Sequence, residues 1–292
     1  MIVITTPTGQ IGREVLQNIL DGPEPIRVIA RDPSRLSPQV RERVEIVQGS
    51  ADDAGVVDKA LTGADTVFWV LPPNPRAESL PAHVLDFVRP LCDAIGRQGV
   101  KRVIGVSSLG RGTARKAGQI SAIFAMDHLV ESMGVSYRSL CPPGFMENML
   151  RQVAPIRDRG VFSLAISGDR RVPICATRDI AAVAADLLLD GSWTGQESVP
   201  IHGPEDLSHD DMAQIMSEVL RRPIRYQQVT GEEYKATLIR HGATEACAQG
   251  IVDMSAAVDQ GLYDTDPRTR RSTSPTTFRQ WCEDTLKPAV LA

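Results

Sequence analysis

The first half of the chain alternates short apolar runs with segments of helical periodicity. Each run has four to seven residues and lacks the alternation of polar and apolar residues that marks a strand exposed on one face. The runs are Ile2 to Thr5, Ile26 to Ala30, Val44 to Val47, Thr66 to Leu71 and Val100 to Val106. Helical patterns lie between them, for example at Val56 to Leu61 and at Leu80 to Ile95. Strands buried on both faces and separated by helices predict a doubly wound parallel α/β sheet with right-handed crossovers.

The rhythm of the chain changes after Pro142. A sixth strand is expected at Val135 to Leu140, and beyond it strands become rarer and short helices more frequent. We therefore expect a nucleotide-binding domain in residues 1–150, with residues 174–190 packing back on it. Residues 151–292 would form a smaller, mainly helical region that covers the substrate.

Capping residues predict where the later helices begin. Thr177 is expected to cap a helix that runs to Leu189 and stops at Gly191. The patterns Ser208-x-x-Asp211 and Thr230-x-x-Glu233 have the form of capping boxes, so a helix is expected after each. The remaining elements expected in this half are a strand at Ser198 to His202 and a last helix from Ser274-Pro275 through Trp281.

Charge and residue usage exclude several classes of function. The 292 residues include 32 Lys and Arg against 36 Asp and Glu, a net charge of −4. Nucleic-acid binding needs a basic surface and is not expected. No apolar run approaches the roughly 18 residues of a membrane span, and strand-like sequence begins at Ile2. We therefore expect no membrane segment, no targeting peptide and a cytoplasmic location.

Cysteine and histidine spacing gives no sign of a metal site. The five cysteines are widely scattered without a C-x-x-C pair, and no two of the five histidines stand three or four positions apart. Reduced thiols and the absence of a bound metal are therefore the expectation.

The segment between the first strand and the first helix has the form of a phosphate-binding loop. Gly9 and Gly12 have the spacing of the last two glycines in a G-x-x-G-x-x-G loop, and Thr6 stands where the first would be. Glycine lets backbone N–H groups approach a pyrophosphate, and the following helix N-terminus adds partial positive charge. The position favours a dinucleotide loop over an ordinary strand–helix turn with a tight glycine.

The end of the second strand indicates which dinucleotide would bind. Arg31 follows Gly12 by nineteen residues, at the place where NAD-binding proteins carry a carboxylate for the ribose 2′-hydroxyl. An arginine there suits a 2′-phosphate, so Arg31, with Arg13 and Arg35 nearby, favours NADP(H) over NAD. Asp32 could pair with one of these arginines, and Arg35 could equally be a solvated helix residue.

The order and spacing of several segments resemble those of the NmrA-like family of atypical short-chain dehydrogenases/reductases. The segments are Thr6–Gly12, Arg31–Pro33, Val47–Gly49, Val67–Pro73, Val100–Arg102 with Ser107–Ser108, Pro142–Asn148, Arg178–Ala184 and Gly203–Glu205. The resemblance covers nearly the whole chain. It implies a Rossmann-type doubly wound parallel sheet that binds NADP(H), with a smaller, mainly helical C-terminal substrate-covering region. Some members of this family reduce quinones or enones with NADPH, and others are redox-sensing regulators.

The resemblance also assigns individual cofactor contacts. Those around the pyrophosphate and the 2′-phosphate would be Thr8, Gly9, Gln10, Ile11, Gly12 and Arg31. Thr6 and Arg35 join them as candidates from their positions in the loop and after the second strand. Those along the rest of the cofactor would be Ser50 and Ala51 at the adenine, then Val70, Leu71 and Pro72, then Ser107 and Ser108 near the nicotinamide ribose, and Cys141 to Gly144, including Pro142, beside the nicotinamide. Val70 and Leu71 are equally expected as buried strand residues, and Ser107 as the cap of its strand.

The chain departs from this family's usual acid–base chemistry. In a Tyr-x-x-x-Lys pair the lysine lowers the tyrosine pKa so that the hydroxyl can donate a proton. The positions four residues after Tyr137, Tyr226, Tyr234 and Tyr263 hold Cys141, Thr230, Leu238 and Pro267. The position of the lysine that family members often carry is Ile123 here, and Lys116 lies about two turns too early. A carbonyl reductase of the usual acid–base type is therefore disfavoured.

Hydride transfer to a quinone remains compatible with this chain, because solvent or one modest donor can supply the proton. His83 and His128 are candidate donors and Cys141 is a candidate redox residue, although each also fits an ordinary solvated or packed position. Neither Ser107 nor Ser108 has glycine on both sides at the spacing of a nucleophile elbow, so hydrolase chemistry is not expected.

We therefore predict an NADPH-dependent reductase of a small carbonyl, enone or quinone compound. Two alternatives stay open: an NADP(H)-binding sensor without turnover, and a non-redox biosynthetic enzyme on the same fold. The expected partner is a small-molecule substrate, and a homodimer is left open.

Overall fold

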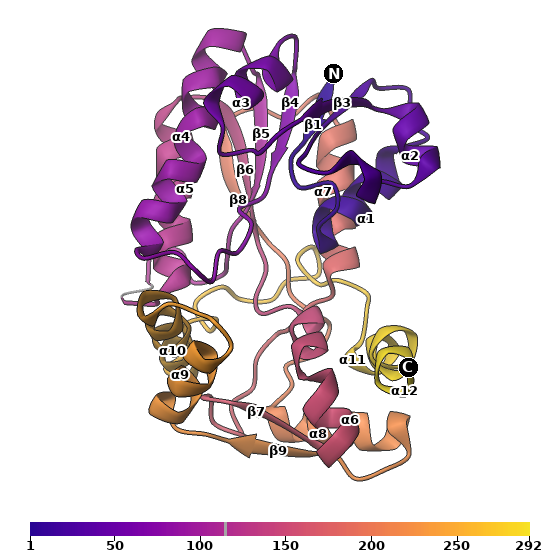
Figure 1. The fold of residues 1–292 in the computed structure, drawn as a ribbon, viewed down its shortest axis with the longest axis vertical. Coiled ribbons are helices and arrows are strands. Elements are labelled where there is room, and N and C mark those ends of the chain that lie inside the picture. Colours follow the sequence, from indigo (N-terminus) through magenta and orange to yellow (C-terminus); the bar gives the residue numbers. More distant parts are fainter. Residues whose placement is uncertain (114–115) are drawn as a thin grey trace.

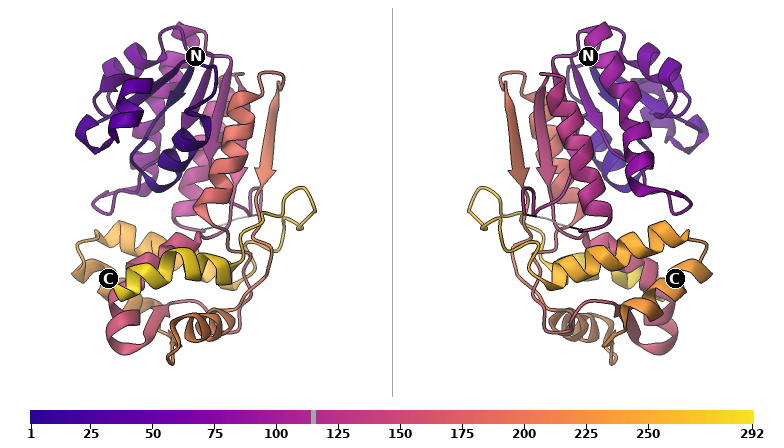
Figure 2. Two further views of the ribbon diagram at one scale, coloured as in Figure 1. Left: turned by 90° about the vertical axis from the view of Figure 1, so that its right-hand side faces the viewer. Right: turned by 90° about the vertical axis from the view of Figure 1, so that its left-hand side faces the viewer.

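The computed structural model describes residues 1–113 and 116–292 and divides into two stacked regions. A sheet flanked by helices forms the upper region of Figure 1, and a smaller, mostly helical region lies beneath it. The chain passes between the two regions several times, as the side views in Figure 2 show. None of the helices in the described residues combines the length and hydrophobicity needed to span a bilayer.

The upper region is built on a seven-stranded sheet in which every pairing is parallel. The strands are β1 (Ile2–Ile4), β2 (Ile26–Ala30), β3 (Glu45–Gln48), β4 (Thr66–Trp69), β5 (Arg102–Val106), β6 (Ser136–Cys141) and β8 (Gln196–Pro200). Their order is β3-β2-β1-β4-β5-β6-β8. Strands β1 to β3 are added toward one edge of the sheet, and the strands from β4 onward are added on the other side of β1. The carboxyl ends of β1 and β4 therefore form the topological switch point, where α/β proteins bind ligands. The predicted Rossmann-type sheet is confirmed.

Helices cover both faces of this sheet. On one face α1 (Gln10–Ile19) lies beside α7 (Thr177–Leu189). The other face carries α3 (Ala54–Leu61), α4 (Leu80–Gln98) and α5 (Gln119–Ser132), as Figure 1 shows. A short 3-10 turn, η1 (Pro33–Arg35), and α2 (Pro38–Arg43) connect β2 to β3. Strands β1, β2 and β4 are buried along their whole length, which explains their unbroken apolar sequences.

The lower region is mainly helical, as predicted. Its elements are η2 (Met146–Gln152), α6 (Val153–Arg159), β7 (Val161–Leu164), α8 (His209–Leu220), β9 (Arg225–Gln228), α9 (Gly231–Arg240), α10 (Glu245–Asp259), α11 (Phe278–Trp281), the π-helical turn η3 (Cys282–Leu286) and α12 (Lys287–Leu291). Phe162, Met216 and Phe278 are fully buried at its centre. The division at residue 150 stays a prediction, and β8 shows that chain beyond it contributes a strand to the main sheet.

A two-stranded parallel sheet of β7 and β9 in the lower region was not predicted. β9 reads Arg-Tyr-Gln-Gln, and three of its four residues are exposed. Its tyrosine, Tyr226, packs on Phe162 at a ring-centroid distance of 5.1 Å. A strand with a single packed side chain has no apolar run that periodicity could detect.

Both predicted capping boxes are confirmed, and the predicted N-cap at Thr177 is wrong. Both capping boxes form, at Ser208 with Asp211 and at Thr230 with Glu233. Thr177 is the first residue of α7 rather than its cap, because the Glu147 carboxylate accepts the Thr177 backbone N–H at 3.0 Å. The helix ends at Leu189, as predicted, and its C-cap is Asp190.

The last helix and the last strand of the main sheet also begin at other residues than predicted. Ser274 stays extended because its N–H donates to the carbonyl of His202 at 2.8 Å, so α11 starts only after Thr277, which caps it. The predicted strand at Ser198 to His202 lies two residues earlier, where it pairs with β6. Both errors come from contacts between segments far apart in the sequence.

The lower region is attached on both sides of the molecule. On the left of Figure 1, α10 meets the loop before α4, where the Thr244 hydroxyl donates to the Ala77 carbonyl at 2.6 Å. On the right, the Trp281 indole N–H of α11 donates to Glu147 at 3.0 Å. The carboxyl edge of the sheet is therefore held over the lower region from two directions.

Candidate functional site

The loop after β1 has the backbone geometry of a phosphate-binding turn. Thr6 adopts φ of +52°, the left-handed conformation that favours glycine, at the position where the sequence pattern lacks its first glycine. A Cβ on Gly12 would overlap the carbonyl oxygen of Thr6, so only glycine lets α1 pack this closely on the loop. α1 has no side-chain cap at its N-terminus, which leaves the first-turn N–H groups available to a ligand.

The predicted pyrophosphate residues differ in what they expose. Gly9 and Gln10 are exposed and Thr8 is partly buried, whereas Ile11 packs in the core between α1 and the sheet. Ile11 can therefore offer a ligand only its backbone. The roles predicted for this loop stay predictions.

The segment after β4 is fastened beside this loop. The buried Thr5 hydroxyl donates to the carbonyl of Phe68 and accepts the N–H of Val70, each at 3.1 Å. Val70, Leu71 and Pro72 are each partly exposed, so they are not simply interior strand residues. The two carboxyl ends at the switch point of the sheet thus lie together.

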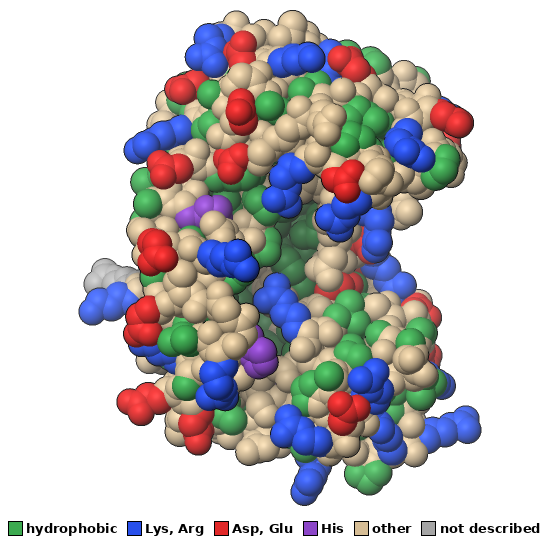
Figure 3. Space-filling model, in the orientation of Figure 1, with side chains coloured by type: hydrophobic (Ala, Val, Ile, Leu, Met, Phe, Trp, Pro, Cys, Tyr) green, Lys and Arg blue, Asp and Glu red, His purple; other side chains and the backbone are tan. Residues whose placement is uncertain are grey.

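Basic side chains stand unpaired at the carboxyl end of β2. Arg31 and Arg35 are exposed, and neither forms an ion pair with any residue that the structure describes. Asp32 does not pair with them: its carboxylate accepts the N–H and hydroxyl of Ser34 at 3.0 and 2.6 Å. These hydrogen bonds, with a smaller contribution from Arg35, lower the pKa of Asp32. Figure 3 shows a hollow between the two regions with a hydrophobic floor and basic groups around it.

Ser50 and Ala51, predicted at the adenine, follow β3 close to these arginines. Ser50 is partly buried and Ala51 is buried. The Gln48 side-chain amide lies 3.5 Å from the carbonyl oxygen of Arg31, which links the ends of β2 and β3. The contact of Ser50 and Ala51 with an adenine stays a prediction.

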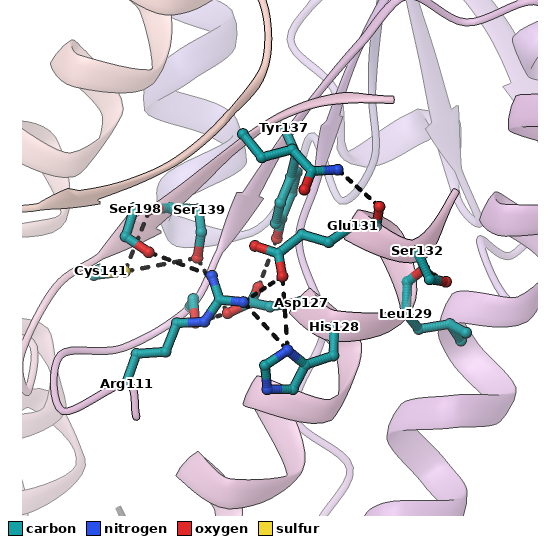
Figure 4. Close-up of polar contacts among 12 residues, drawn as sticks. Arg111, Asp127, His128, Leu129, Glu131, Ser132, Tyr137, Ser139, Cys141 and Ser198 are labelled. Atoms are coloured by element: carbon teal, nitrogen blue, oxygen red, sulfur yellow. Dashed lines mark hydrogen bonds and ion pairs between the residues drawn. The ribbon is translucent and has the colours of Figure 1, made fainter. Parts of the chain in front are cut away.

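A buried hydroxyl–carboxylate cluster lies between α5 and strands β5 and β6, with Ser107 directly after β5 and Tyr137 and Ser139 within β6. The Ser107 hydroxyl donates to Asp127 Oδ2 at 2.5 Å, and the Ser139 hydroxyl donates to the same oxygen at 3.1 Å. The Tyr137 hydroxyl donates to Asp127 Oδ1 at 2.6 Å. Gly105 makes room for it, because a Cβ there would overlap the tyrosine hydroxyl. Figure 4 shows Asp127, Tyr137 and Ser139 turned toward one another between α5 and β6.

Beside this cluster, a cavity of about 300 Å³ opens near the ends of β5, β6 and β8. It is lined by Ser108, Arg111, Gly112, His128, Cys141, Ser198, Pro200 and Asp266. Arg111 crosses it, donating to Ser198 Oγ at 3.3 Å and to the carboxylate of Glu131, as Figure 4 shows. Its charge is thereby largely neutralised within the protein.

The three candidate catalytic residues are not brought together. Cys141 is buried, and burial raises the pKa of its thiol to about 11, so the thiol is neutral near pH 7. His128 has 69% of its side chain exposed and lies at the rim of the cavity, near Glu131. His83 lies elsewhere, on α4, with Nε2 3.4 Å from the carbonyl oxygen of Pro72. Pro142, predicted beside the nicotinamide, is buried after β6.

No tyrosine–lysine pair forms in the part of the chain that the structure describes. The family's lysine position is occupied by Ile123, which packs against the core on this face of the sheet. Tyr137 is fully buried and its hydroxyl is committed to Asp127, and burial and this carboxylate raise its pKa. Tyr263 is buried too, and its pKa is raised by burial. Residues 1–113 and 116–292 contain no cluster of His, Cys, Asp and Glu that could hold a metal.

Asp127 and Arg111 were not predicted from the sequence. A signal for Asp127 was present: it occupies the apolar stripe of α5, between the buried residues Phe124 and Val130. A carboxylate in such a stripe needs a buried partner. Arg111 lies in a loop without a sequence pattern, so nothing comparable pointed to it.

Comparison with known proteins agrees with this architecture. The NmrA-like family matches residues 1–277. Among characterised relatives, the NAD(P)H azoreductase of Xenophilus azovorans is 27% identical over 272 residues, covering 92% of each chain. The (4-alkanoyl-5-oxo-2,5-dihydrofuran-3-yl)methyl phosphate reductase of Streptomyces griseus is 31% identical over 243 residues, covering 82% of this chain and 80% of the relative.

A solved structure has the same fold. The NADPH-dependent quinone oxidoreductase of Escherichia coli, crystallised with NADPH, superposes with a TM-score of 0.80 at 20% identity, covering 96% of this chain and 98% of the other. The match of the family to almost the whole length, on a seven-stranded parallel sheet with a helical C-terminal region, establishes that this chain belongs to the NmrA-like family.

Proposed function

We propose that this protein is an NADPH-dependent reductase of a small, electron-poor compound such as a quinone. The observation that carries the proposal is a pair of arginines, Arg31 and Arg35, that form no ion pair among the described residues. They lie beside a glycine turn whose helix N-terminus has no side-chain cap. A dinucleotide with an additional 2′-phosphate complements both features: the helix N-terminus suits the pyrophosphate, and a guanidinium suits the phosphate.

The residues fit such a cofactor along the carboxyl edge of the sheet. Thr6 and Thr8 to Gly12 would hold the pyrophosphate, Arg31 and Arg35 the 2′-phosphate, and Ser50 and Ala51 the adenine. Val70 to Pro72 would lie along the cofactor, with Ser107, Ser108 and Pro142 at the nicotinamide half. Gly12 supports this path directly, since any larger residue would close the turn beneath the phosphates.

The activities of the similar proteins support the same class of reaction. The azoreductase and the dihydrofuranyl phosphate reductase are both reductases, and the structural neighbour is a quinone reductase that was solved with NADPH. Their substrates differ, so the relatives support reduction of a small molecule rather than one particular compound.

The lack of a suitable proton donor among the described side chains near the nicotinamide favours substrates that need none from the protein. NADPH supplies a hydride when bound, and the reduced product must then gain a proton. Near the expected nicotinamide position, the thiol of Cys141 has a pKa of about 11 and is a poor proton donor. Tyr137 is fully buried, and its hydroxyl donates to Asp127 rather than to a ligand. A quinone that accepts a hydride becomes the hydroquinone anion, which is stabilised and can take its proton from solvent. A simple ketone, which forms a strongly basic alkoxide, is disfavoured.

The test is NADPH oxidation by the purified protein with a panel of quinones, azo dyes, enones and simple ketones. We expect a loss of nicotinamide absorbance with quinones or azo dyes, no reaction with the ketones, and a lower rate with NADH. Tight NADPH binding without turnover on any acceptor would instead support the sensor alternative, which the isoleucine at position 123 also favours. Failure to bind NADPH at all would refute both.

A further inference from the structure

Asp127 is a buried carboxyl residue on the apolar stripe of α5, and three hydroxyl groups donate to it. It has no exposed surface and lies between α5 and the sheet, in line with Phe124 and Val130. Burying a carboxylate costs free energy, which its hydrogen bonds to these hydroxyl groups have to offset. The role of Asp127 follows from the hydrogen bonds that its two carboxylate oxygens accept.

Those oxygens fix the direction of three hydroxyl groups. Asp127 Oδ2 lies 2.5 Å from Ser107 Oγ and 3.1 Å from Ser139 Oγ, and Oδ1 lies 2.6 Å from the Tyr137 hydroxyl. A carboxylate only accepts, so each hydroxyl must point its proton inward. Burial raises the pKa of Asp127, opposed by these hydrogen bonds and by the charge of Arg111.

For Ser107 the consequence is a defined polarity. Its one hydroxyl proton is used on Asp127, and its backbone N–H donates to the carbonyl of Leu140 at 2.7 Å. Ser107 Oγ therefore has only lone pairs left for a ligand, and Ser107 directly follows Val106, the last residue of β5. Ser107 can accept a hydrogen bond there but cannot donate one to a substrate oxygen.

We propose that Asp127 is a positioning residue that makes Ser107 an acceptor for a hydroxyl of the nicotinamide ribose. The inference rests on the proposed function and deepens it, because a serine so oriented holds the cofactor and takes no part in protonating the substrate. It agrees with a substrate class that draws its proton from solvent.

The experiment compares two ligands on the full-length protein. NADPH reaches both halves of the site, whereas adenosine 2′,5′-bisphosphate contains only the adenosine half. Asp127→Asn and Ser107→Ala should each weaken NADPH binding by about three- to tenfold, the range of one hydrogen bond, and leave the bisphosphate affinity unchanged. The double variant should bind NADPH no more weakly than Ser107→Ala alone.

Tyr137→Phe is the matched control, because it removes a hydroxyl from the same carboxylate without touching Ser107. It should lower stability and leave the ratio of the two affinities at the wild-type value. The proposal is overturned if Asp127→Asn weakens both ligands equally, if it leaves NADPH binding unchanged, or if its effect adds to that of Ser107→Ala.

A second comparison applies if Asp127→Asn does not fold. An NADPH analogue without the nicotinamide-ribose hydroxyls should bind the wild-type protein more weakly than NADPH does, and should bind Ser107→Ala as well as NADPH does. Equal losses in both proteins would contradict an acceptor role for Ser107. A wild-type protein that binds neither NADPH nor the bisphosphate would refute the proposed function itself.

Discussion

Arg31 is the residue that we propose distinguishes NADPH from NADH, through a contact of its guanidinium to the 2′-phosphate. Because this side chain has no ion-pair partner among the described residues, Arg31→Ala removes a contact to ligand without breaking one inside the protein. We expect NADPH binding to weaken by about 1–3 kcal/mol, the value of a charge-assisted hydrogen bond, with NADH binding nearly unchanged. Isothermal titration calorimetry with both nucleotides measures this difference.

Arg41→Ala is the control for the loss of one positive charge, since Arg41 is exposed on α2. It should leave both affinities near those of the wild type. Equal weakening of NADPH and NADH in Arg31→Ala would show that Arg31 does not read the 2′-phosphate.

The variant Gly12→Ala tests whether the turn between β1 and α1 requires glycine at this position. A Cβ at this position meets the Thr6 carbonyl oxygen, which is backbone and cannot rotate away. Gly12→Ala should therefore lower the free energy of unfolding by about 1–3 kcal/mol and abolish NADPH binding, as urea denaturation and titration would measure.

Gly96→Ala provides the opposite case. Gly96 lies within α4 with open space around its Cα, so alanine there should raise the stability by roughly 0.5–1 kcal/mol through helix propensity. If the two variants behaved alike, packing at the loop would not be the reason for glycine at position 12.

At the level of elements, Glu147 joins three parts of the chain. From η2, its carboxylate accepts the Thr177 N–H at the start of α7 and the Trp281 indole N–H of α11, each at 3.0 Å. Glu147→Ala would leave two buried donors unpaired, so we expect a loss of about 2–4 kcal/mol in unfolding free energy. Trp281→Phe removes only one of these bonds and should cost about 1 kcal/mol by chemical denaturation. Equal costs would mean that the bond to α7 contributes nothing.

The elements that sequence patterns predicted are those whose signals are local. Buried strands such as Ile26–Ala30 have unbroken apolar runs, and the boxes at Ser208 and Thr230 satisfy N–H groups three residues away. The errors at Thr177 and Ser274 arose where a distant partner, Glu147 or His202, took over the backbone group. Strand β9 escaped detection because its order comes from pairing with β7.

The same distinction applies to the candidate site. The glycine turn and Arg31 could be found because their chemistry depends on spacing along the chain. The cluster around Asp127 joins α5 to β6 and to the end of β5, so its members become neighbours only in the folded sheet.

For the molecule as a whole, the buried free thiols of Cys92 and Cys141 make the free energy of unfolding depend on alkaline pH. Burial raises the pKa of Cys92 and of Cys141 to about 11, against roughly 8.5 for an exposed thiol. Above about pH 8.5 the unfolded chain loses these protons while the folded chain keeps them, so stability falls as the pH rises toward 11. We expect a loss of roughly 1–2 kcal/mol per thiol between about pH 7.5 and 10.

Urea denaturation at the two pH values measures this loss. The Cys92→Ala/Cys141→Ala variant is the control, because it removes two of the titrating groups and should show a shallower decline. An equally steep decline in the variant would assign the effect to other residues.

The place of β8 in the sheet has a consequence for how the protein is made. Its neighbour β6 ends at Cys141, yet β8 begins only at Gln196, after η2, α6, β7 and α7 have been added. During synthesis the edge of β6 therefore stays uncovered until this later segment has left the ribosome, and an uncovered parallel edge invites pairing with other chains. Slow codons or a stalled ribosome within this interval would leave a nascent chain prone to aggregation and dependent on chaperones, even though the finished sheet hides that edge.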